Sequence, residues 1–131
     1  MAQITNWDEF PTVEYIPGVY RQAVCGTQVM MTRITYHPGV FVPDHKHEAE
    51  QLMLIVEGKL WAKVGDEEKD VEKGDLLIIN SNVIHSFRNL GPGNAVFYEC
   101  FAPVRLEYLI GYKGPDPSLE MMKRNLLKEK E

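Results

Sequence analysis

The sequence has no long apolar run and no N-terminal signal for secretion. Its longest uninterrupted apolar runs, residues 52–56 and 76–79, are far shorter than the roughly 20 residues that a membrane-spanning helix needs. The first residues also lack the basic region with which a secretory signal begins. These absences predict a cytoplasmic protein that does not interact with membranes.

Positive charge and cysteine are scarce as well. The 14 lysines and arginines are outnumbered by 19 aspartates and glutamates, which gives a net charge of −5, and no stretch gathers the basic residues on one face. Binding to nucleic acid is therefore not expected, because it needs a basic surface that neutralises phosphates. The two cysteines, Cys25 and Cys100, could form one disulfide. Without a secretion signal, we expect two reduced thiols that serve as small apolar residues.

The composition is that of a globular protein, with 44% hydrophobic and 25% charged residues in a chain of 131. There is no internal repeat, linker or low-complexity segment, so we expect a single domain over residues 1–131. From about residue 29 to 110, short runs of β-branched and aromatic residues alternate with glycine, proline, asparagine and aspartate. This spacing is typical of an all-β sandwich or barrel.

Only the C-terminal segment, at about residues 117–130, has helical periodicity. Asp116 is a suitable N-cap, and Pro117 suits the first helical position. An apolar stripe at helical spacing follows, formed by Leu119, Met122 and Leu126. We expect this helix to pack against the outside of its own domain, with a dimer contact as the alternative.

The residues that carry chemistry gather around three of the four histidines. His45 and His47 are two residues apart, so on a strand both imidazoles face the same side. Neutral imidazole is the commonest protein ligand for first-row transition metals. Gln51 has the same parity, but a straight strand would place it about 20 Å from His45, too far to share one ion. A bend at residues 48–50 would return Gln51 opposite His47, at the start of a strand over residues 51–57.

These assignments have alternatives. A His-X-His pair by itself also occurs at protein surfaces and in cores. Glu50 competes with Gln51 as a ligand, although strand alternation would point Glu50 away from the metal side. His37 lies outside the pattern, and we expect it to be structural or exposed to solvent.

The order and spacing of residues in the middle half of the chain resemble the two signature motifs of the cupin superfamily. The matching residues are Gly39, His45, His47, position 51 and Gly58 for the first motif, and Gly74, His85 and Asn89 for the second. The resemblance implies an all-β fold, a single cupin β-barrel (double-stranded β-helix or jelly roll) with the short C-terminal helix appended. It also implies one divalent metal ion in the lumen, held by His45, His47, Gln51 and His85.

The sequence departs from these motifs in two places. Gln51 stands where the family usually has Glu, and Asn80 and Asn82 replace a Pro and a Gly. A glutamine ligand carries no charge, which favours polarisation of a substrate over redox chemistry at the metal. Asn82 tolerates the left-handed turn that glycine provides. Imidazole and amide oxygen suit Mn, Fe, Ni, Co and Zn alike, so the identity of the transition metal stays open.

A second cluster, Glu99, Phe101 and Arg105, together with Gln51, resembles the small cupins of pectin and alginate breakdown, which open the ring of unsaturated uronates to linear keto acids. The resemblance implies that these three residues form the catalytic and substrate-holding set, with Glu99 in place of the family's Asp. Alternation places Glu99 and Phe101 on one strand face, and an arginine can hold a substrate carboxylate bidentately. Two further cations could supplement Arg105, namely Lys46 and Arg33.

A plainer interpretation of the same cluster is structural. Phe101 would then belong to the core, Glu99 would be a charge at the rim, and Arg105 would pair with Glu107. The sequence by itself does not decide between the two.

We therefore expect a metal-dependent enzyme that acts on a small, anionic keto, hydroxy or sugar acid, with ring opening of an unsaturated uronate as the leading reaction. The alternatives are a cupin lyase or dioxygenase that uses another small acid, and a barrel that binds a small molecule without turnover. With imidazoles of ordinary pKa, metal binding should be lost as the pH falls through about 6 to 7. Cupins are commonly dimers, and a strand edge at residues 13–23 needs a partner or cover, so a homodimer is expected.

Overall fold

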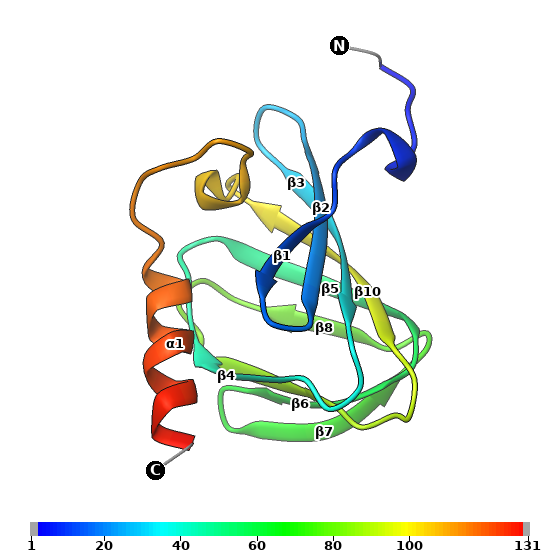
Figure 1. Ribbon diagram of the computed structural model, residues 1–131, viewed down its shortest axis with the longest axis vertical. Coiled ribbons are helices and arrows are strands. Elements are labelled where there is room, and N and C mark those ends of the chain that lie inside the picture. The colour runs from blue at the N-terminus through cyan, green and yellow to red at the C-terminus, as the bar shows by residue number, and fades with distance from the viewer. Residues whose placement is uncertain (1–2, 130–131) are drawn as a thin grey trace.

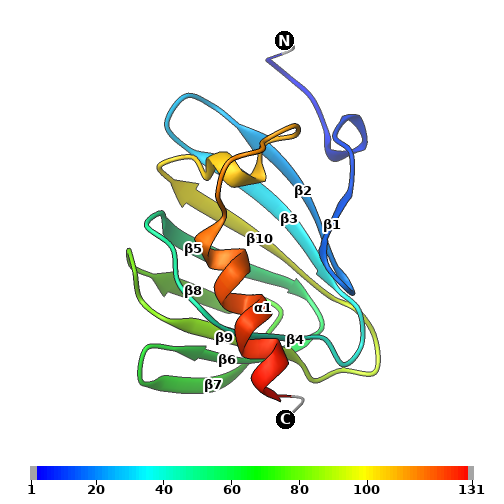
Figure 2. The ribbon, with the colours of Figure 1, turned by 60° about the vertical axis from the view of Figure 1, so that its left-hand side comes forward.

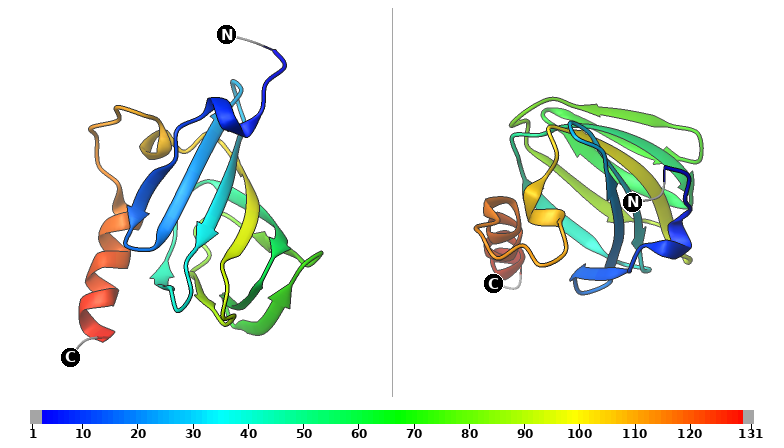
Figure 3. Two further views of the ribbon diagram at one scale, coloured as in Figure 1. Left: turned by 45° about the vertical axis from the view of Figure 1, so that its right-hand side comes forward. Right: turned by 90° about the horizontal axis from the view of Figure 1, so that it is seen from above.

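The computed structural model describes residues 3–129 as two antiparallel β-sheets that face each other, with one α-helix alongside (Figure 1). The larger sheet contains, in spatial order, β1 (Val13–Ile16), β2 (Val19–Cys25), β3 (Met30–Tyr36), β10 (Ala95–Ala102), β5 (Glu50–Glu57) and β8 (Leu76–Ile79). The smaller sheet contains β4 (Phe41–His45), β9 (His85–Asn89), β6 (Lys59–Val64) and β7 (Glu67–Glu72). The remaining elements are two 3₁₀ turns, η1 (Trp7–Glu9) and η2 (Leu106–Tyr108), and the helix α1 (Pro117–Glu129). The expected all-β jelly roll with a C-terminal helix is confirmed, as two facing sheets rather than one closed sheet (Figure 3).

Strand alternation decides which side chains enter the space between the sheets. On β10, Ala95, Phe97, Glu99 and Phe101 are buried, and the residues between them are less so. The main core is apolar, and its largest fully buried side chains are Met53, Ile55, Leu60, Ile79, Phe87 and Phe97. Polar residues on the same inward faces interrupt this apolar core, and they mark the candidate site.

Two turns bring the motif segments into place. Gly58, between β5 and β6, has a φ of +82°, and a Cβ at this position would lie only 2.7 Å from the carbonyl oxygen of Asn94. A larger residue there would strain the turn and clash. Asn82, before β9, has a φ of 61°, which is the left-handed conformation predicted for it. Its N–H donates to the carbonyl oxygen of His47 at 2.9 Å, so this turn ties the two histidine segments together.

The helix α1 lies across the molecule beside β4 (Figure 2). Asp116 caps it, because its Oδ1 accepts a hydrogen bond from the N–H of Leu119 at 3.0 Å. Met122 is buried in the main core, so the helix packs on its own domain as predicted. The helix ends at Glu129, and residue 130, the last of the expected helix, lies outside the described residues. Among the described residues, no helix is long and apolar enough to cross a membrane.

The N-terminal segment forms the hairpin β1–β2 at one edge of the larger sheet, where residues 13–23 were expected to expose a strand edge. Tyr15 on β1 donates a hydrogen bond from its hydroxyl to Asp116 Oδ2 at 2.8 Å, which connects this hairpin to the start of α1. Cys25 and Cys100 are free thiols, as predicted.

Candidate metal centre

His45, His47 and His85 meet between the sheets. His45 ends β4, His47 follows in the bend before β5, and His85 begins β9, where it pairs with His45 across the ladder. All three are buried, and one ring nitrogen from each lies within 4.8 Å of the others. The cluster is therefore able to hold a metal ion.

Hydrogen bonds fix the tautomer of each imidazole. Every Nδ1 lies 2.8 Å from a backbone carbonyl oxygen, that of Pro43 for His45, Ala49 for His47 and Val83 for His85. A carbonyl only accepts, so Nδ1 carries the proton and Nε2 keeps its lone pair. Among the described residues, the buried Nε2 of His85 has no hydrogen-bond partner. Such an orphaned acceptor is what a metal ligand presents.

Burial keeps these imidazoles neutral. Desolvation, reinforced by the positive charge of Arg105, lowers the pKa of His47 from 6.5 to about 4. Burial lowers the pKa of His85 to about 3, and it also holds the pKa of His45 well below 6.5. Burial therefore shifts the pH window expected from ordinary histidines, about 6 to 7, to more acidic solution, because protons compete for these nitrogens only there.

Gln51 faces the same cluster from β5. Its side chain is fully buried, whereas Glu50 is exposed, as strand alternation predicted. Gln51 Nε2 donates to Glu99 Oε2 at 2.6 Å, which turns Oε1 toward His47, 3.1 Å from its Nε2. With His47 neutral and protonated on Nδ1, two acceptor atoms face each other at this distance. A cation bound by both would relieve their repulsion, so the residues present fit a divalent metal.

Glu99 lies next to this amide, on the inward face of β10. Its carboxylate accepts from Gln51 and, at 2.9 Å, from the hydroxyl of Thr32. Burial raises the pKa of Glu99 from 4.5 to about 7, although the Thr32 hydrogen bond and the positive charge of Arg105 oppose the shift. A carboxyl with this pKa is populated in both protonation states at neutral pH, so it can accept and return a proton.

Arg105 and Phe101 have the structural contacts that the plainer interpretation described. Arg105 Nε donates to Glu107 Oε1 at 2.6 Å, and Nη1 donates to the hydroxyl of Tyr108 at 2.7 Å. Phe101 is fully buried in a second apolar cluster, and its ring contacts that of His47 edge-on with centroids 5.6 Å apart. Arg105 nevertheless lines the cavity beside Glu99. Phe101 does not line this cavity and packs against the ring of His47 instead.

Three other basic or histidine side chains considered from the sequence lie elsewhere. Lys46 and His37 are exposed, and Arg33 is on the outward parity of β3, between the buried Thr32 and Ile34. None of the three lines the cavity.

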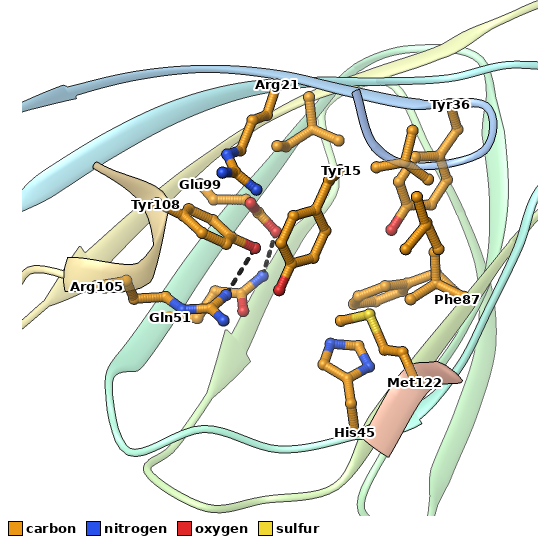
Figure 4. Close-up of a pocket in the computed structure, with 14 residues that line it drawn as sticks. Tyr15, Arg21, Tyr36, His45, Gln51, Phe87, Glu99, Arg105, Tyr108 and Met122 are labelled. Atoms are coloured by element: carbon orange, nitrogen blue, oxygen red, sulfur yellow. Dashed lines mark hydrogen bonds between the residues drawn. The ribbon is translucent and has the colours of Figure 1, made fainter. Parts of the chain in front are cut away.

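The cavity beside the histidines also has walls that the motifs did not indicate. Its volume is about 30 Å³, and besides His45, Gln51, Glu99 and Arg105 its lining includes Tyr15, Arg21, Tyr108 and Met122 (Figure 4). These come from β1, β2, η2 and α1, all outside the two motifs. Alternation could have indicated Arg21, because it shares the parity of Val19 on β2 and so carries a charge on the inward face.

Comparison with known proteins places this geometry in context. The family model described as "Cupin domain" matches residues 32–101, which is more than half of the chain. A germin-like protein from Morus alba is 27% identical over 105 residues, which cover 76% of this chain and 45% of that protein. The chain spans less than half the length of the curated relatives it matches.

Solved structures resemble the fold. KdgF from a Halomonas species superimposes with a TM-score of 0.75 at 21% identity, covering 83% of this chain and all of that one. Oxalate decarboxylase from Bacillus subtilis, whose structure is described by its Mn(II) centres, superimposes with a TM-score of 0.66 at 20% identity, covering 79% of this chain and 31% of that one. At such identities these likenesses show the fold.

Proposed function

This chain belongs to the cupin family, and on that basis we propose that it is a metal-dependent enzyme that acts on a small anionic keto, hydroxy or sugar acid. The proposed ligands are the Nε2 atoms of His45, His47 and His85 and the amide oxygen of Gln51. The metal is a divalent transition ion from the set Mn, Fe, Ni, Co and Zn. When bound, it supplies a Lewis acid that polarises a carbonyl or hydroxyl oxygen of the substrate.

The observation that carries the proposal is the position and pKa of Glu99. Its carboxyl is buried beside the proposed ligand Gln51, and its pKa of about 7 allows it to remove a proton and return it at neutral pH. Gln51 and Thr32 hold the two carboxylate oxygens at defined positions. Glu99 is thus the proposed acid–base group, and its burial keeps bulk water from the proton transfer.

The reaction that these groups support best is the opening of an unsaturated uronate ring. The bond between the anomeric carbon and the ring oxygen breaks, and the anomeric hydroxyl loses its proton to become an aldehyde. The ring oxygen becomes a keto oxygen, and the ring carbon at the far end of the double bond gains a proton. One proton leaves and one returns, so the product is an isomer, and a single carboxyl such as Glu99 is sufficient to move them. The resemblance carried by Gln51, Glu99 and Arg105 supports this choice.

The cavity volume favours a second candidate. About 30 Å³ accommodates roughly two water molecules, less than a six-carbon sugar acid requires, unless a wall such as Met122 moves. The alternative substrate is therefore a shorter keto or hydroxy acid.

Substitution of Glu99 tests the proposal. Glu99→Gln should retain its metal, measured by elemental analysis, while turnover falls by about 10²- to 10⁴-fold. Turnover of an unsaturated uronate is followed by the loss of ultraviolet absorbance of its conjugated double bond. Glu50→Gln, on the exposed face of β5, is the matched control and should keep full activity. Full activity in Glu99→Gln would refute the assigned role.

A further inference from the structure

Arg21 is a buried cation that the proposed chemistry does not use. We propose that Arg21, together with the free Nη2 of Arg105, forms a subsite for one carboxylate group inside the cavity. The subsite deepens the proposed function, on which it rests for the nature of the reaction, by assigning the place where the acid group of the substrate binds.

Among the described residues Arg21 forms no direct ion pair, although its charge acts on the carboxyl of Glu99. Its side chain projects inward from β2 and is only 8% exposed. Its Cζ lies 4.4 Å from the ring centroid of Tyr15 and 4.0 Å from that of Tyr108, so aromatic faces surround it. Among residues 3–129, the ion pairs involve Lys59, Lys63 and Arg105 but never Arg21. A buried guanidinium that no carboxylate contacts directly is costly, and it marks a place where an anion is expected to bind.

The free nitrogen atoms of both arginines are buried. In the part of the chain that the structure describes, Arg21 Nη1 and Arg105 Nη2 have no hydrogen-bond partner. The Cζ atom of Arg105 also lies 4.0 Å from the Tyr108 centroid, so the two guanidinium carbons are no more than twice that distance apart. Both side chains line the same cavity. A carboxylate has two oxygens and can accept charge-assisted hydrogen bonds from both groups.

The charges that face the cavity leave room for an anion. Glu107 neutralises Arg105, and the carboxyl of Glu99 already accepts from Thr32 and Gln51. The hydroxyl of Tyr15 is committed to Asp116, which lies at the start of α1. The acceptors at the cavity are thus already used, and the N–H groups of Arg21 Nη1 and Arg105 Nη2 are left for the oxygens of a bound carboxylate.

Arg21 and Tyr108 also separate two cavities, because both residues line each of them. They line the inner cavity and, on their other side, an outer hollow of about 190 Å³ whose walls are mostly apolar and include Phe10, Ala23, Met30, Leu109 and Ile110. Ile110 is 75% exposed, so this outer hollow reaches the surface. An acid that enters from there meets the guanidinium of Arg21 before it reaches the histidines.

Acetate is the probe for this subsite, and acetamide is its uncharged counterpart. The melting temperature of the full-length protein is measured at pH 7 in increasing acetate, with chloride added to hold the ionic strength constant. Acetate should raise the melting temperature and acetamide should not, because only a bound anion neutralises Arg21. The series is run on the protein as purified and again after removal of metal with a chelator, so the result does not depend on the proposed catalysis.

Variants assign the effect to Arg21. Arg21→Gln should raise the half-saturating acetate concentration at least tenfold, and Arg21→Lys, which keeps a charge, should recover part of the affinity. Arg33→Gln, on the outward parity of the neighbouring strand, is the matched control and should respond like the unaltered protein. Equal acetate affinity in Arg21→Gln and the unaltered protein, or no acetate response in the unaltered protein, would overturn the subsite. Absence of uronate turnover with an intact acetate response would instead count against the proposed reaction alone.

Discussion

Gln51 donates a hydrogen bond of 2.6 Å from its Nε2 to Oε2 of Glu99, so the proposed metal ligand and the proposed acid–base group are joined directly. A glutamate at position 51 could not make this bond, because an ionised carboxylate has no donor. The neutral amide therefore has two roles. It leaves the charge of the ion uncompensated, and it orients the carboxyl that moves the proton.

The first prediction concerns Gln51→Glu. Metal binding should be kept or tightened by the added charge, but activity on an anionic substrate should fall by about 10- to 100-fold. Two facing carboxylates should also raise the pKa of Glu99 further, so the rise in activity governed by this group should move to higher pH. Elemental analysis and a pH–rate profile measure these effects. An unchanged pH profile would contradict the link between the two residues.

Gln51→Leu provides the complementary prediction. It removes the amide oxygen and the donor together, so metal affinity should fall by about 10- to 100-fold. Competition with a chelator of known affinity measures this loss. If neither substitution at position 51 alters metal affinity, Gln51 is not a ligand.

The pH dependence of metal binding follows from the depressed histidine pKa values. Because the pKa of His47 is about 4 and that of His85 about 3, the cluster should still hold its metal at pH 5 and lose it as the pH falls toward 4 and below. Equilibrium dialysis across this range, followed by elemental analysis, measures retention. Loss of the metal between pH 7 and 6 would mean that these imidazoles titrate normally.

Stability of the metal-free protein should also depend on pH. The unfolded chain binds protons at histidines with a pKa near 6.5, whereas in the folded protein His47 and His85 stay neutral until about pH 4 and 3. Protons are then bound preferentially by the unfolded chain, so this contribution to stability is complete above about pH 6.5 and is lost as the pH falls from there.

Glu99 has the opposite effect on stability. Its pKa is raised from 4.5 to about 7 on folding, so between these pH values the folded protein binds this proton more tightly than the unfolded chain does. This single carboxyl opposes the effect of three histidines. The net prediction is a melting temperature that decreases from pH 6.5 to 4.5, followed by circular dichroism. His47→Gln should make this decrease shallower, whereas His37→Gln, at an exposed position, should not. A melting temperature that is constant over this range would refute the prediction.

Asp116→Ala should destabilise the protein by about 2 kcal/mol. It removes the cap of α1, which is worth about 1 kcal/mol, and leaves the hydroxyl of Tyr15 without its acceptor. Asp116→Asn keeps an oxygen that accepts from the N–H of Leu119 and places an amide nitrogen that can donate to the hydroxyl oxygen of Tyr15, so it should lose less stability. Denaturant unfolding measures the two free energies, and an Asp116→Ala variant as stable as the unaltered protein would show that neither hydrogen bond contributes.

The sequence predicted the parts of the site that depend on local geometry. Parity correctly preferred Gln51 over Glu50, which follows from the two-residue period of β5. It also predicted that His45 and His47 face one side, and they do meet, although only His45 is on a strand and His47 is in the bend that follows. The left-handed turn at Asn82 was likewise predictable from the residue type.

The rest of the cavity depends on long-range packing, which no motif spacing encodes. Tyr15 and Met122 reach it from opposite ends of the described chain, and their positions follow only once the hairpin and the helix are docked. Alternation predicted that Phe101 faces inward, but not that it would pack behind His47 instead of lining the cavity. For Arg105, the sequence offered both a substrate contact and a pair with Glu107, and only the folded geometry shows that one guanidinium can pair and still present Nη2 to the cavity.

The hydrogen bond between Tyr15 and Asp116 joins residues 101 positions apart. On the ribosome the chain emerges from its N-terminus, so all three histidines are synthesised before the residues that close the cavity. The wall that α1 contributes through Met122 is therefore synthesised after every strand of both sheets.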